Sequence, residues 1–521
     1  MQNRTHAGNR NIGLQMMMGI PHQCGDPVSW LESTRGKQIG QSTRSFKCPG
    51  QALLMPPLQP TGHDAGFRAN HAAPEKQILQ EQGLTGTSRL SGSRHGRVFP
   101  LTIGVAEDQT PAIKQAANGG YCMPVDQSAL DFLDLDSGLP SAALAARDGV
   151  RNWVDEAFMP HASRLWRENE FPREYFAELG KLNVFGTTIS GWGCPGLDPF
   201  TSGVMMRELE RGDTGLRTCA SVQGSLAMNA IADFGSEEQR QSLLPDMAAG
   251  THLSCFGLTE PGHGSNPGGM TTTARRDGDH YVLSGQKKWI GNATVADTAL
   301  IWAKADDVEE VEPTSSRAIR GFLVDTSLAG YQASLIEGRM SLRIGLTADI
   351  SLDEVRVPVE AMLPEAHGLG GPLSCLNHAR YGITWGAVGA AMACLEEALE
   401  HARDREIFGR PLAGFQLAQD KLARMLTMLN QSQLVAWRLA ELKADGNLST
   451  EQISLGKAAN VEAASVIART GRELLGGMGI CDDRACFRHL CNMESVATYE
   501  GTRDIHHLIL GHALTGIPAF R

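Results

Sequence analysis

The spacing of apolar residues changes twice along this chain. Between about residues 126 and 252, apolar positions recur at steps of three and four, a period that predicts helices. Between about 253 and 365 the period falls to two, which predicts β-strands. Strands are expected at 298–303, 321–325 and 350–357. Beyond about residue 366 the helical period returns in longer segments.

The last part of the chain predicts long amphipathic helices. One stops near Arg405, a second is ended by Gly446, and Ser449 with Gln452 forms a capping-box pattern that opens a third. Apolar residues of the first helix share one face: Val388, Ala391, Leu395, Ala398 and Ala402. Antiparallel helices of this length pack as a bundle. The whole pattern predicts a mainly α protein with a central β domain, divided at 126–252, 253–365 and 366–521.

Residues 1–125 differ from the rest of the chain. They are rich in Gly, Ser, Gln, Pro, Arg and His and lack a sustained apolar period, a composition that resists core formation. The first 100 residues carry 11 Lys and Arg against 5 Asp and Glu, whereas the remainder has a net charge of −17. We expect a disordered or targeting extension without a catalytic role. Upstream sequence translated from a wrong start is a third interpretation.

Charge and apolar runs argue against two classes of protein. The net charge of the chain is −11 at pH 7, which disfavours a surface that binds nucleic acid. The longest apolar run, 383–395, ends at Glu396 and is shorter than the roughly 18 residues of a membrane span. We therefore expect neither a nucleic-acid partner nor a membrane span.

The cysteines indicate a reducing environment. Eleven cysteines make an odd total, which fits reduced thiols in an intracellular compartment better than a disulfide framework. Cys481, Cys486 and Cys491 lie near His489, but their spacing is not that of a metal site. We predict that these three are buried apolar thiols and that the chain binds no metal.

Near the C-terminus a carboxylate lies on a turn that precedes an apolar segment. Glu500 belongs to the Tyr-Glu-Gly-Thr sequence at 499–502, which is followed by the apolar residues 505–517. In a helix-lined pocket such a carboxylate suits a general base that removes a weakly acidic C–H proton, provided that burial raises its pKa. A glutamate before an apolar helix is also typical of a cap or of a charge that answers the helix dipole. On these residues alone the second interpretation is favoured until other parts of the chain support the first.

Further candidates for ligand binding lie in the β domain and at helix ends. The glycine-rich loop at 255–269 frees the backbone to approach a ligand, but it lacks the pattern of a Rossmann dinucleotide site. Trp289, at a strand end, either closes the core or forms a flat wall against an aromatic cofactor. Arg405 and Arg410 lie where a predicted helix ends. They are either a solvated cap or a pair of side chains that bind a pyrophosphate.

Six motifs occur in one order over nearly 400 residues: FGLTEPGHGS, WIGN, LNHARYG, RxxFGRP, LLGGMG and YEGTRDIH. With them, residues 128–521 resemble the acyl-CoA dehydrogenase family, and within it they are most similar to glutaryl-CoA dehydrogenases. The resemblance implies an N-terminal helical domain, a small β-barrel-like domain and a C-terminal four-helix bundle. It also implies a homotetramer with FAD near the subunit contacts.

The resemblance assigns chemistry to individual positions. It implies that Glu500 removes the α-proton of an acyl thioester while the β-hydride passes to flavin N5. The backbone N–H of Glu500 and a flavin ribityl hydroxyl would stabilise the thioester oxygen. Positions implied to contact FAD are Phe256, Leu258, Thr259, Gly264, Ser265, Trp289, Ile290, Gly291, Arg405, Phe408, Gln416, Glu473, Leu474, Leu475, Gly476, Gly477, Thr502, Asp504 and Phe520. Positions implied to line the acyl-CoA channel are Ser265, Leu373, Asn377, Arg380 and Gly501.

The choice of substrate rests on a second group of residues: Glu210, Arg217, Thr218, Ser221 and Tyr499. The resemblance implies that Arg217 and Ser221 meet the distal carboxylate of a glutaryl chain. An arginine suits that role because its guanidinium group makes bidentate, charge-assisted contacts. Alternatively, Arg217 pairs only with Glu210 or Asp213.

Two departures from the family pattern bear on the reaction. Gly291 replaces the usual threonine near flavin N5, as in plant short-chain acyl-CoA oxidases, and Asn266 replaces an aspartate of the flavin loop. The first hypothesis is the oxidative decarboxylation of glutaryl-CoA to crotonyl-CoA, with electrons passed to an electron-transfer flavoprotein. The alternatives are a short-chain acyl-CoA dehydrogenase or oxidase without decarboxylation, and an idle member that binds CoA or a partner.

The compartment depends on how the first 125 residues are interpreted. If they are an artefact of the start site, we expect an enzyme of the bacterial cytoplasm. If they are a transit peptide, the mitochondrial matrix becomes the better expectation.

Overall fold

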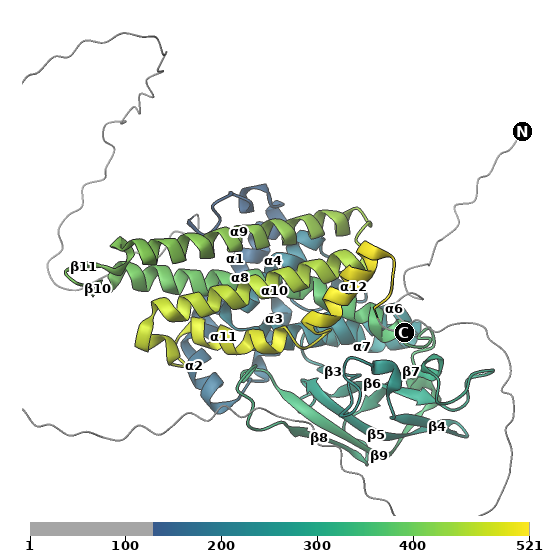
Figure 1. The fold of residues 1–521 in the computed structure, drawn as a ribbon. Helices are drawn as coiled ribbons and strands as arrows, with labels where there is room; N and C mark the ends of the chain where they lie inside the picture. Colours follow the sequence, from purple (N-terminus) through teal and green to yellow (C-terminus); the bar gives the residue numbers. More distant parts are fainter. Residues whose placement is uncertain (1–128, 520–521) are drawn as a thin grey trace, which may run out of the picture. The chain divides into compact units, whose positions relative to one another are not determined.

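The structure is a computed structural model that describes residues 129–519. The extension predicted for 1–125 and the predicted FAD contact Phe520 lie outside the described residues. Within that range, helices flank a central β-sheet in the chain, as the apolar periods predicted (Figure 1). No helix of the described part is long and apolar enough to cross a bilayer.

The N-terminal helices come first in the chain. They are η3 (Asp136–Gly138), α1 (Ser141–Trp153), the π-helical η4 (Val154–Phe158), α2 (Met159–Glu168), α3 (Glu174–Lys181), α4 (Pro199–Gly212), α5 (Thr214–Ser221), the π-helical η5 (Val222–Met228), α6 (Asn229–Phe234) and α7 (Glu237–Ala248). A short hairpin of β1 (Ser190–Gly191) and β2 (Cys194–Pro195) precedes α4. A π-helical segment inside a helix is often found at a functional site.

A seven-stranded mixed sheet forms the curled middle domain. Its strands are β3 (Ser254–Gly257), β4 (Thr273–Asp277), β5 (His280–Gly291), β6 (Thr298–Ala305), β7 (Ile319–Asp325), β8 (Tyr331–Leu335) and β9 (Thr347–Pro358), with η6 (Pro267–Gly269), η7 (Ser316–Ala318) and η8 (Val359–Ala361) between or after them. The strand order is β3-β6-β4-β5-β9-β8, with β7 also paired to β6. The pairing of β3 with β6 and of β4 with β6 is parallel, and the other pairs are antiparallel.

Long helices form the C-terminal bundle. Its elements are α8 (Gly370–Asp404), the hairpin of β10 (Glu406–Ile407) and β11 (Arg410–Pro411), η9 (Leu412–Gly414), α9 (Gln416–Ala444), α10 (Thr450–Leu474), η10 (Gly476–Ile480), α11 (Ala485–Val496) and α12 (Arg503–Thr515). The five apolar residues predicted to share a face of α8 are all buried. The predicted capping box of Ser449 and Gln452 opens α10.

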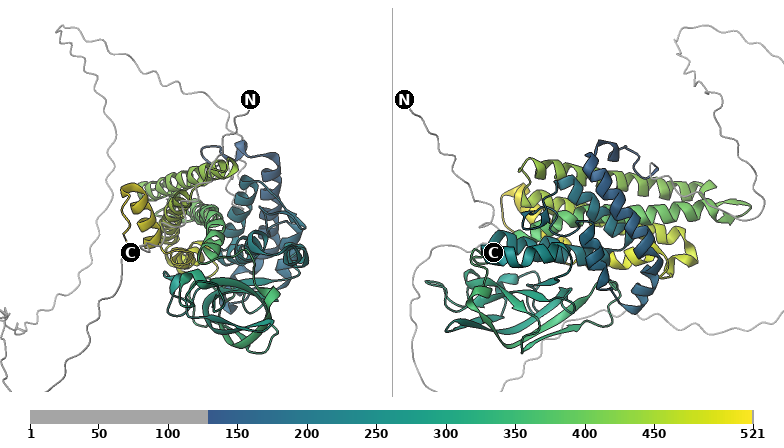
Figure 2. Two further views of the ribbon diagram at one scale, coloured as in Figure 1. Left: turned by 90° about the vertical axis from the view of Figure 1, so that its right-hand side faces the viewer. Right: turned by 180° about the vertical axis from the view of Figure 1, so that it is seen from behind.

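The directions of the bundle helices decide which residues meet. Asn460 on α10 donates to the carbonyl of Thr384 on α8, and Gly471, later on α10, lies against Cys394 and Ala398, so α8 and α10 run in the same direction. α9 runs the opposite way beside them (Figures 1 and 2). The β10–β11 hairpin therefore lies at one end of the bundle, and α12 lies at the other (Figure 1).

An apolar cluster joins the helices to the sheet. Phe256 and Leu258 from the end of β3 pack with Val222 of η5 and with Cys375 and Ala379 of α8. Because these side chains come from all three domains, their burial fixes the loop after β3 against the helices.

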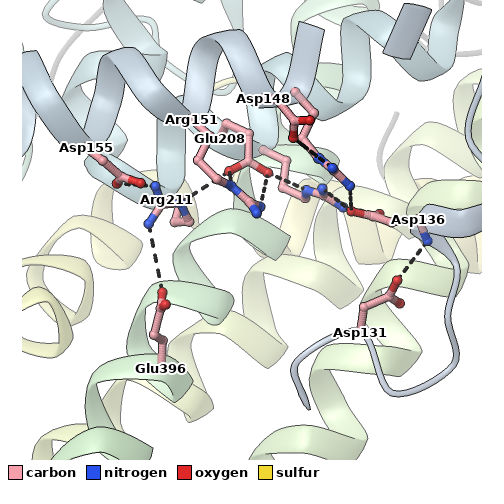
Figure 3. A network of polar contacts seen from close by, with 10 residues as sticks. Asp131, Asp136, Asp148, Arg151, Asp155, Glu208, Arg211 and Glu396 are labelled. Carbon is pink, nitrogen blue, oxygen red and sulfur yellow. Dashed lines mark hydrogen bonds and ion pairs between the residues drawn. The ribbon is translucent and has the colours of Figure 1, made fainter. Parts of the chain in front are cut away.

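A network of buried ion pairs connects the N-terminal helices to one another (Figure 3). The carboxylate of Glu208 on α4 is fully buried and accepts hydrogen bonds from Arg151, Arg207 and Arg211 at 2.8–3.2 Å. Arg207 also donates twice to Asp136 at 2.7 Å. Burial alone raises the pKa of Glu208, but the guanidinium groups outweigh it and hold this pKa at about 2.

We expect Glu208→Gln to lower the free energy of unfolding by about 3–5 kcal/mol, because neutral glutamine removes the buried anion that three guanidinium groups share, while only Arg207 and Arg211 keep a further carboxylate partner. The folded pKa of Glu208 lies below its ordinary value of 4.5, so its contribution is complete above that pH and is lost as the pH falls toward about 2. Chemical denaturation at several pH values measures both effects. The control is Glu156→Gln, at an exposed position of η4, which should change the free energy of unfolding by less than about 0.5 kcal/mol.

Candidate functional site

The turn that carries Glu500 links α11 to α12. Glu500 has a φ of +52°, the left-handed region that non-glycine residues rarely adopt, and Gly501 follows with a φ of +96°. The side chain of Thr502, not of Glu500, caps α12 by accepting from the backbone N–H of Ile505. The carboxylate oxygen Oε2 of Glu500 is buried and has no hydrogen-bond partner in the described part of the chain. The helix-cap interpretation of Glu500 is therefore wrong.

The substrate residues predicted on α4 and α5 meet this turn. Arg217 is fully buried, and its Nε donates to the carboxylate of Glu210 at 2.7 Å. Its Nη2 donates to the hydroxyl of Tyr499, which lies 3.4 Å from the hydroxyl of Thr218. Burial opposes the charge of Arg217, but Glu210 outweighs this effect and raises the pKa of the guanidinium group. Arg217 is thus locked beside the turn as a cation.

Two polar atoms in this region are left without a partner among the described residues. They are Nη1 of Arg217 and Oγ of Ser221, both buried. Ser221 follows Arg217 by four residues on the same helix, so both side chains project from one face of α5. An unpaired buried guanidinium N–H is unfavourable unless a ligand pairs with it. Both atoms can donate a hydrogen bond to a group that accepts one.

The residues predicted on α8 reach the turn from the other side. Arg380 donates from Nε to the backbone carbonyl of Glu500 at 2.8 Å and from Nη1 to the side chain of Asn377 at 3.1 Å. Asn377 donates in turn to the hydroxyl of Thr450. Leu373, one turn earlier, packs on the apolar cluster around Phe256. The structure thus brings the predicted α8 residues together with Glu500, the predicted base, and with the loop after β3.

The environment of Glu500 suits a proton acceptor. Burial raises the pKa of its carboxyl group above the ordinary value, and Arg217, Lys457 and Arg380 oppose this rise. Burial likewise lowers the pKa of Lys457 to about 7. Burial thus opposes the charged forms of both Glu500 and Lys457, while the charge of each group favours that of the other. A carboxylate with a raised pKa is a stronger base than an exposed one.

A buried ion pair anchors the glycine-rich loop. Glu260 accepts from Nζ of Lys287 at 2.9 Å and from the backbone N–H groups of Thr271 and Thr272 at 2.6 and 2.9 Å. The loop residues beyond it are open: Ser265 is exposed, and a Cβ added to Gly264 would meet no atom within 4 Å. Phe256 and Leu258 are buried, and Thr259 is half-buried. The anchor therefore holds a loop whose far side is free for a ligand.

The end of β5 lies against the same helices. Trp289 has a φ of +62° and is 55% exposed, Ile290 is buried, and a Cβ added to Gly291 would lie 3.0 Å from Val222. Asn292 donates to the carbonyl of Cys219 on α5 at 3.0 Å. This bond holds the chain that follows β5 against the helix that carries Arg217.

Most of the remaining predicted cofactor residues lie far from this site. Arg405, Phe408 and Gln416 belong to the β10–β11 end of the bundle, about 36 Å along α8 from Arg380 at 1.5 Å per residue. Residues 473–477 end α10 at the same place, where Glu473 pairs with Lys421 of α9. Phe408 is 94% exposed. Thr502 and Asp504, at the start of α12, stay with Glu500.

The sequence analysis missed several residues of the site. Lys457 lies between the buried Ile453 and Val461 at steps of four, and a lysine on such an apolar stripe was a detectable signal. The sequence held no such signal for Glu260 and Lys287, because their ion pair joins a loop to a strand that lies elsewhere in the chain. The prediction of buried thiols is confirmed for Cys486. It is wrong for Cys481, which is exposed between η10 and α11, and for Cys491, which is only half-buried on α11. Among the described residues no group of His, Cys, Asp and Glu could hold a metal ion.

Sequence profiles of three domains match this chain. They describe the N-terminal, middle and C-terminal domains of acyl-CoA dehydrogenases and cover residues 141–251, 255–355 and 366–515. The chain belongs to the acyl-CoA dehydrogenase family and is an FAD-dependent enzyme of that class.

Individual members of the family are similar to this chain over most of their length. The mitochondrial short-chain specific acyl-CoA dehydrogenase of Bos taurus is 33% identical over 72% of this chain and 91% of its own length. A crystal structure of glutaryl-CoA dehydrogenase from Mycobacterium smegmatis is 48% identical, with a TM-score of 0.72, over 75% of this chain and 99% of that one. A second structure from this organism, in complex with FADH2, is 45% identical, with the same TM-score, over 76% of this chain and all of that one.

The residues around the loop after β3 and the end of β5 fit a flavin. Gly262 and Gly264 leave the loop after β3 open on one side, where a Cβ at either position would meet no atom within 4 Å. Trp289 exposes a flat aromatic face at the adjacent strand end. An open backbone beside an exposed indole suits a planar, polar ring system.

Gly386 on α8 makes room for the ion pair of Glu210 and Arg217. A Cβ at Gly386 would lie 2.0 Å from Oε2 of Glu210 and 3.2 Å from Nε of Arg217. We expect Gly386→Ala to displace the carboxylate and lower the free energy of unfolding by about 1–3 kcal/mol, as measured by chemical denaturation. The matched control is Gly382→Ala, one turn earlier, where the new Cβ would meet Met206 at an ordinary 3.4 Å. Equal stability of the two variants would contradict this role.

Proposed function

We propose that this enzyme oxidises and decarboxylates glutaryl-CoA to crotonyl-CoA and passes the electrons to an electron-transfer flavoprotein. One observation carries the proposal: Arg217 and Ser221 present unpaired, buried polar atoms from one helix face beside the turn of Glu500. A guanidinium N–H and a hydroxyl together suit a carboxylate at the far end of a short acyl chain. The 48% identity with a glutaryl-CoA dehydrogenase supports the same substrate.

The side chains divide the work of this reaction. Glu500 removes the α-proton of the thioester, and its own backbone N–H stabilises the developing charge on the thioester oxygen. Arg217 and Ser221 hold the distal carboxylate until its C–C bond breaks and it leaves the oxidised acyl chain as CO₂. The electron pair of that bond stays on the acyl chain, and the γ-carbon takes up the proton that Glu500 removed, which gives crotonyl-CoA. Bound FAD supplies the acceptor for the β-hydrogen and two electrons. The apolar cluster of Phe256 and Leu373 excludes water from one side of the site.

A short-chain acyl-CoA dehydrogenase or oxidase without decarboxylation is the second candidate. Gly291 favours it, because the threonine hydroxyl usual at this position in the family is missing, and Val222 lies only 3.0 Å from where a Cβ would stand. The relatives named short-chain specific acyl-CoA dehydrogenase also support it. If this second function is correct, Arg217 only holds the side chains of Glu210 and Tyr499 in place.

We also propose that a second copy of the chain completes each flavin site in a homotetramer. The predicted cofactor positions form two groups separated by the length of the bundle, and one chain cannot bring them together. At the far end, Phe408 and Leu417 are 94% and 81% exposed, as expected for side chains that another subunit covers.

Anaerobic addition of glutaryl-CoA should bleach the flavin of the wild type and yield crotonyl-CoA by mass analysis. We expect Arg217→Met to reduce the rate of bleaching by glutaryl-CoA at least about 100-fold, because the distal carboxylate loses its buried partner. Bleaching by butyryl-CoA, which has no distal carboxylate, should fall much less.

A double variant distinguishes the role of Arg217 in substrate binding from its role in the packing of the interior. Arg217→Met leaves Glu210 as an unpaired buried carboxylate, so Glu210→Gln combined with Arg217→Met keeps the interior neutral. Glu210→Gln alone is the matched control. Equal losses with both substrates would assign Arg217 a structural role, and hydrogen peroxide formation in air without an added acceptor would indicate an oxidase.

For the assembly, we expect Phe408→Asp to lower both the oligomer mass and the FAD content of the purified protein, since a charge would enter the contact between subunits. Light scattering coupled to gel filtration and flavin absorbance measure these two quantities. Met340→Asp, at another apolar side chain that is 71% exposed, is the control and should change neither. A Phe408→Asp protein with full mass and full FAD would contradict the shared site.

A further inference from the structure

Three consecutive carbonyl groups of the Glu500 turn are held by two buried cations. Nζ of Lys457 on α10 donates to the carbonyls of Tyr499 and of Gly501, the latter at 2.6 Å. Nε of Arg380 on α8 donates to the carbonyl of Glu500, between them, at 2.8 Å. Lys457 and Arg380 are only 1% and 3% exposed. The carbonyls of residues 499–501 therefore all point to α8 or α10.

This arrangement also fixes the direction of an N–H group. The described residues contain no cis peptide bond, and in a trans peptide the C=O and the N–H point in opposite directions. The carbonyl of Tyr499 and the N–H of Glu500 belong to one peptide group. Since the carbonyl points to Lys457, the N–H points away from α10. Within the described residues this N–H has no acceptor, as is also true of Oε2 of Glu500.

We propose that Lys457 is a positioning residue that aims and polarises the backbone N–H of Glu500 toward the thioester oxygen of the substrate. The inference rests on the proposed role of Glu500 as the base. A cation on the carbonyl side of a peptide group draws electron density from the N–H side, which makes the N–H a stronger donor. Lys457 thereby stabilises the charge that develops on the oxygen without touching the substrate.

The same ammonium group acts on the carboxylate of Glu500. The groups facing Glu500 are Arg217 of α5, Glu210 of α4, Arg380 of α8, Lys457 of α10, His506 of α12 and the neighbouring Tyr499. Burial lowers the pKa of His506 to about 3 and raises that of the Tyr499 hydroxyl, so both are neutral near pH 7. Loss of the positive charge of Lys457 therefore raises the pKa of Glu500 further, because that charge now opposes the effect of burial.

Two variants of Lys457 separate its charge from its hydrogen bonds. Lys457→Met removes both, and Lys457→Gln keeps a neutral donor of similar reach. The measurement is the rate of anaerobic flavin reduction across a range of pH, with glutaryl-CoA or butyryl-CoA, whichever reduces the wild type. We expect a fall of about 10-fold or more for methionine and a smaller one for glutamine, below the roughly 100- to 1,000-fold loss on removing an oxyanion donor itself. In both variants the rise of the rate with pH should move to higher pH.

The controls distinguish this inference from the function on which it rests. Lys443→Met, at a half-buried lysine of neighbouring α9, should leave the rate and its pH dependence unchanged. Normal flavin reduction in Glu500→Gln would overturn the proposed base. If Glu500→Gln is inactive but either Lys457 variant keeps the wild-type rate and pH dependence, only the inference on Lys457 is wrong. A loss of rate that is equal at every pH would assign Lys457 a purely structural role.

Discussion

The Glu500 turn depends on buried positive charge. Its residues adopt left-handed backbone conformations that are unfavourable by about 1 kcal/mol or more for a side chain other than glycine. Lys457 and Arg380 compensate by binding three consecutive carbonyls, and Arg217 fixes the preceding tyrosine. A side chain at Gly501 would lie 2.9 Å from the ring of His506, so this position requires glycine for space as well as for its φ. The helices α5, α8 and α10 are thus tied together through the turn.

Buried ions support the rest of the site in the same way. Glu260 and Lys287 hold the glycine-rich loop, while Glu208 gathers three arginines among the N-terminal helices. Each carboxylate is stable inside the protein only because guanidinium, ammonium or backbone N–H groups satisfy its oxygens. Such pairs contribute little net stability but are strongly destabilising when one partner is removed. They therefore impose one arrangement on helices whose apolar faces alone would permit several.

Arg217 illustrates how structure and specificity share one side chain. Nε binds Glu210, Nη2 binds Tyr499, and Nη1 is buried without a partner among residues 129–519. Two of its donor positions hold neighbouring side chains, and under the proposed function the third binds the distal carboxylate of the substrate. A lysine could not do this, because its single ammonium group lacks the planar fork that reaches three partners in fixed directions.

The sequence by itself determined the order of helical and β segments, the capping box at Ser449 and the turn of Glu500, because these depend on local spacing and local motifs. Its motifs also indicated the family and its cofactor. Only the tertiary structure decided that Lys457 holds the turn, that Arg217 keeps a free donor, and that Arg405 lies about 36 Å along α8 from Arg380. Cys481 was predicted to be buried yet lies exposed. Burial and charge pairing arise from contacts between segments that are distant in the chain. The local periodicity of apolar residues does not indicate which of these segments come into contact.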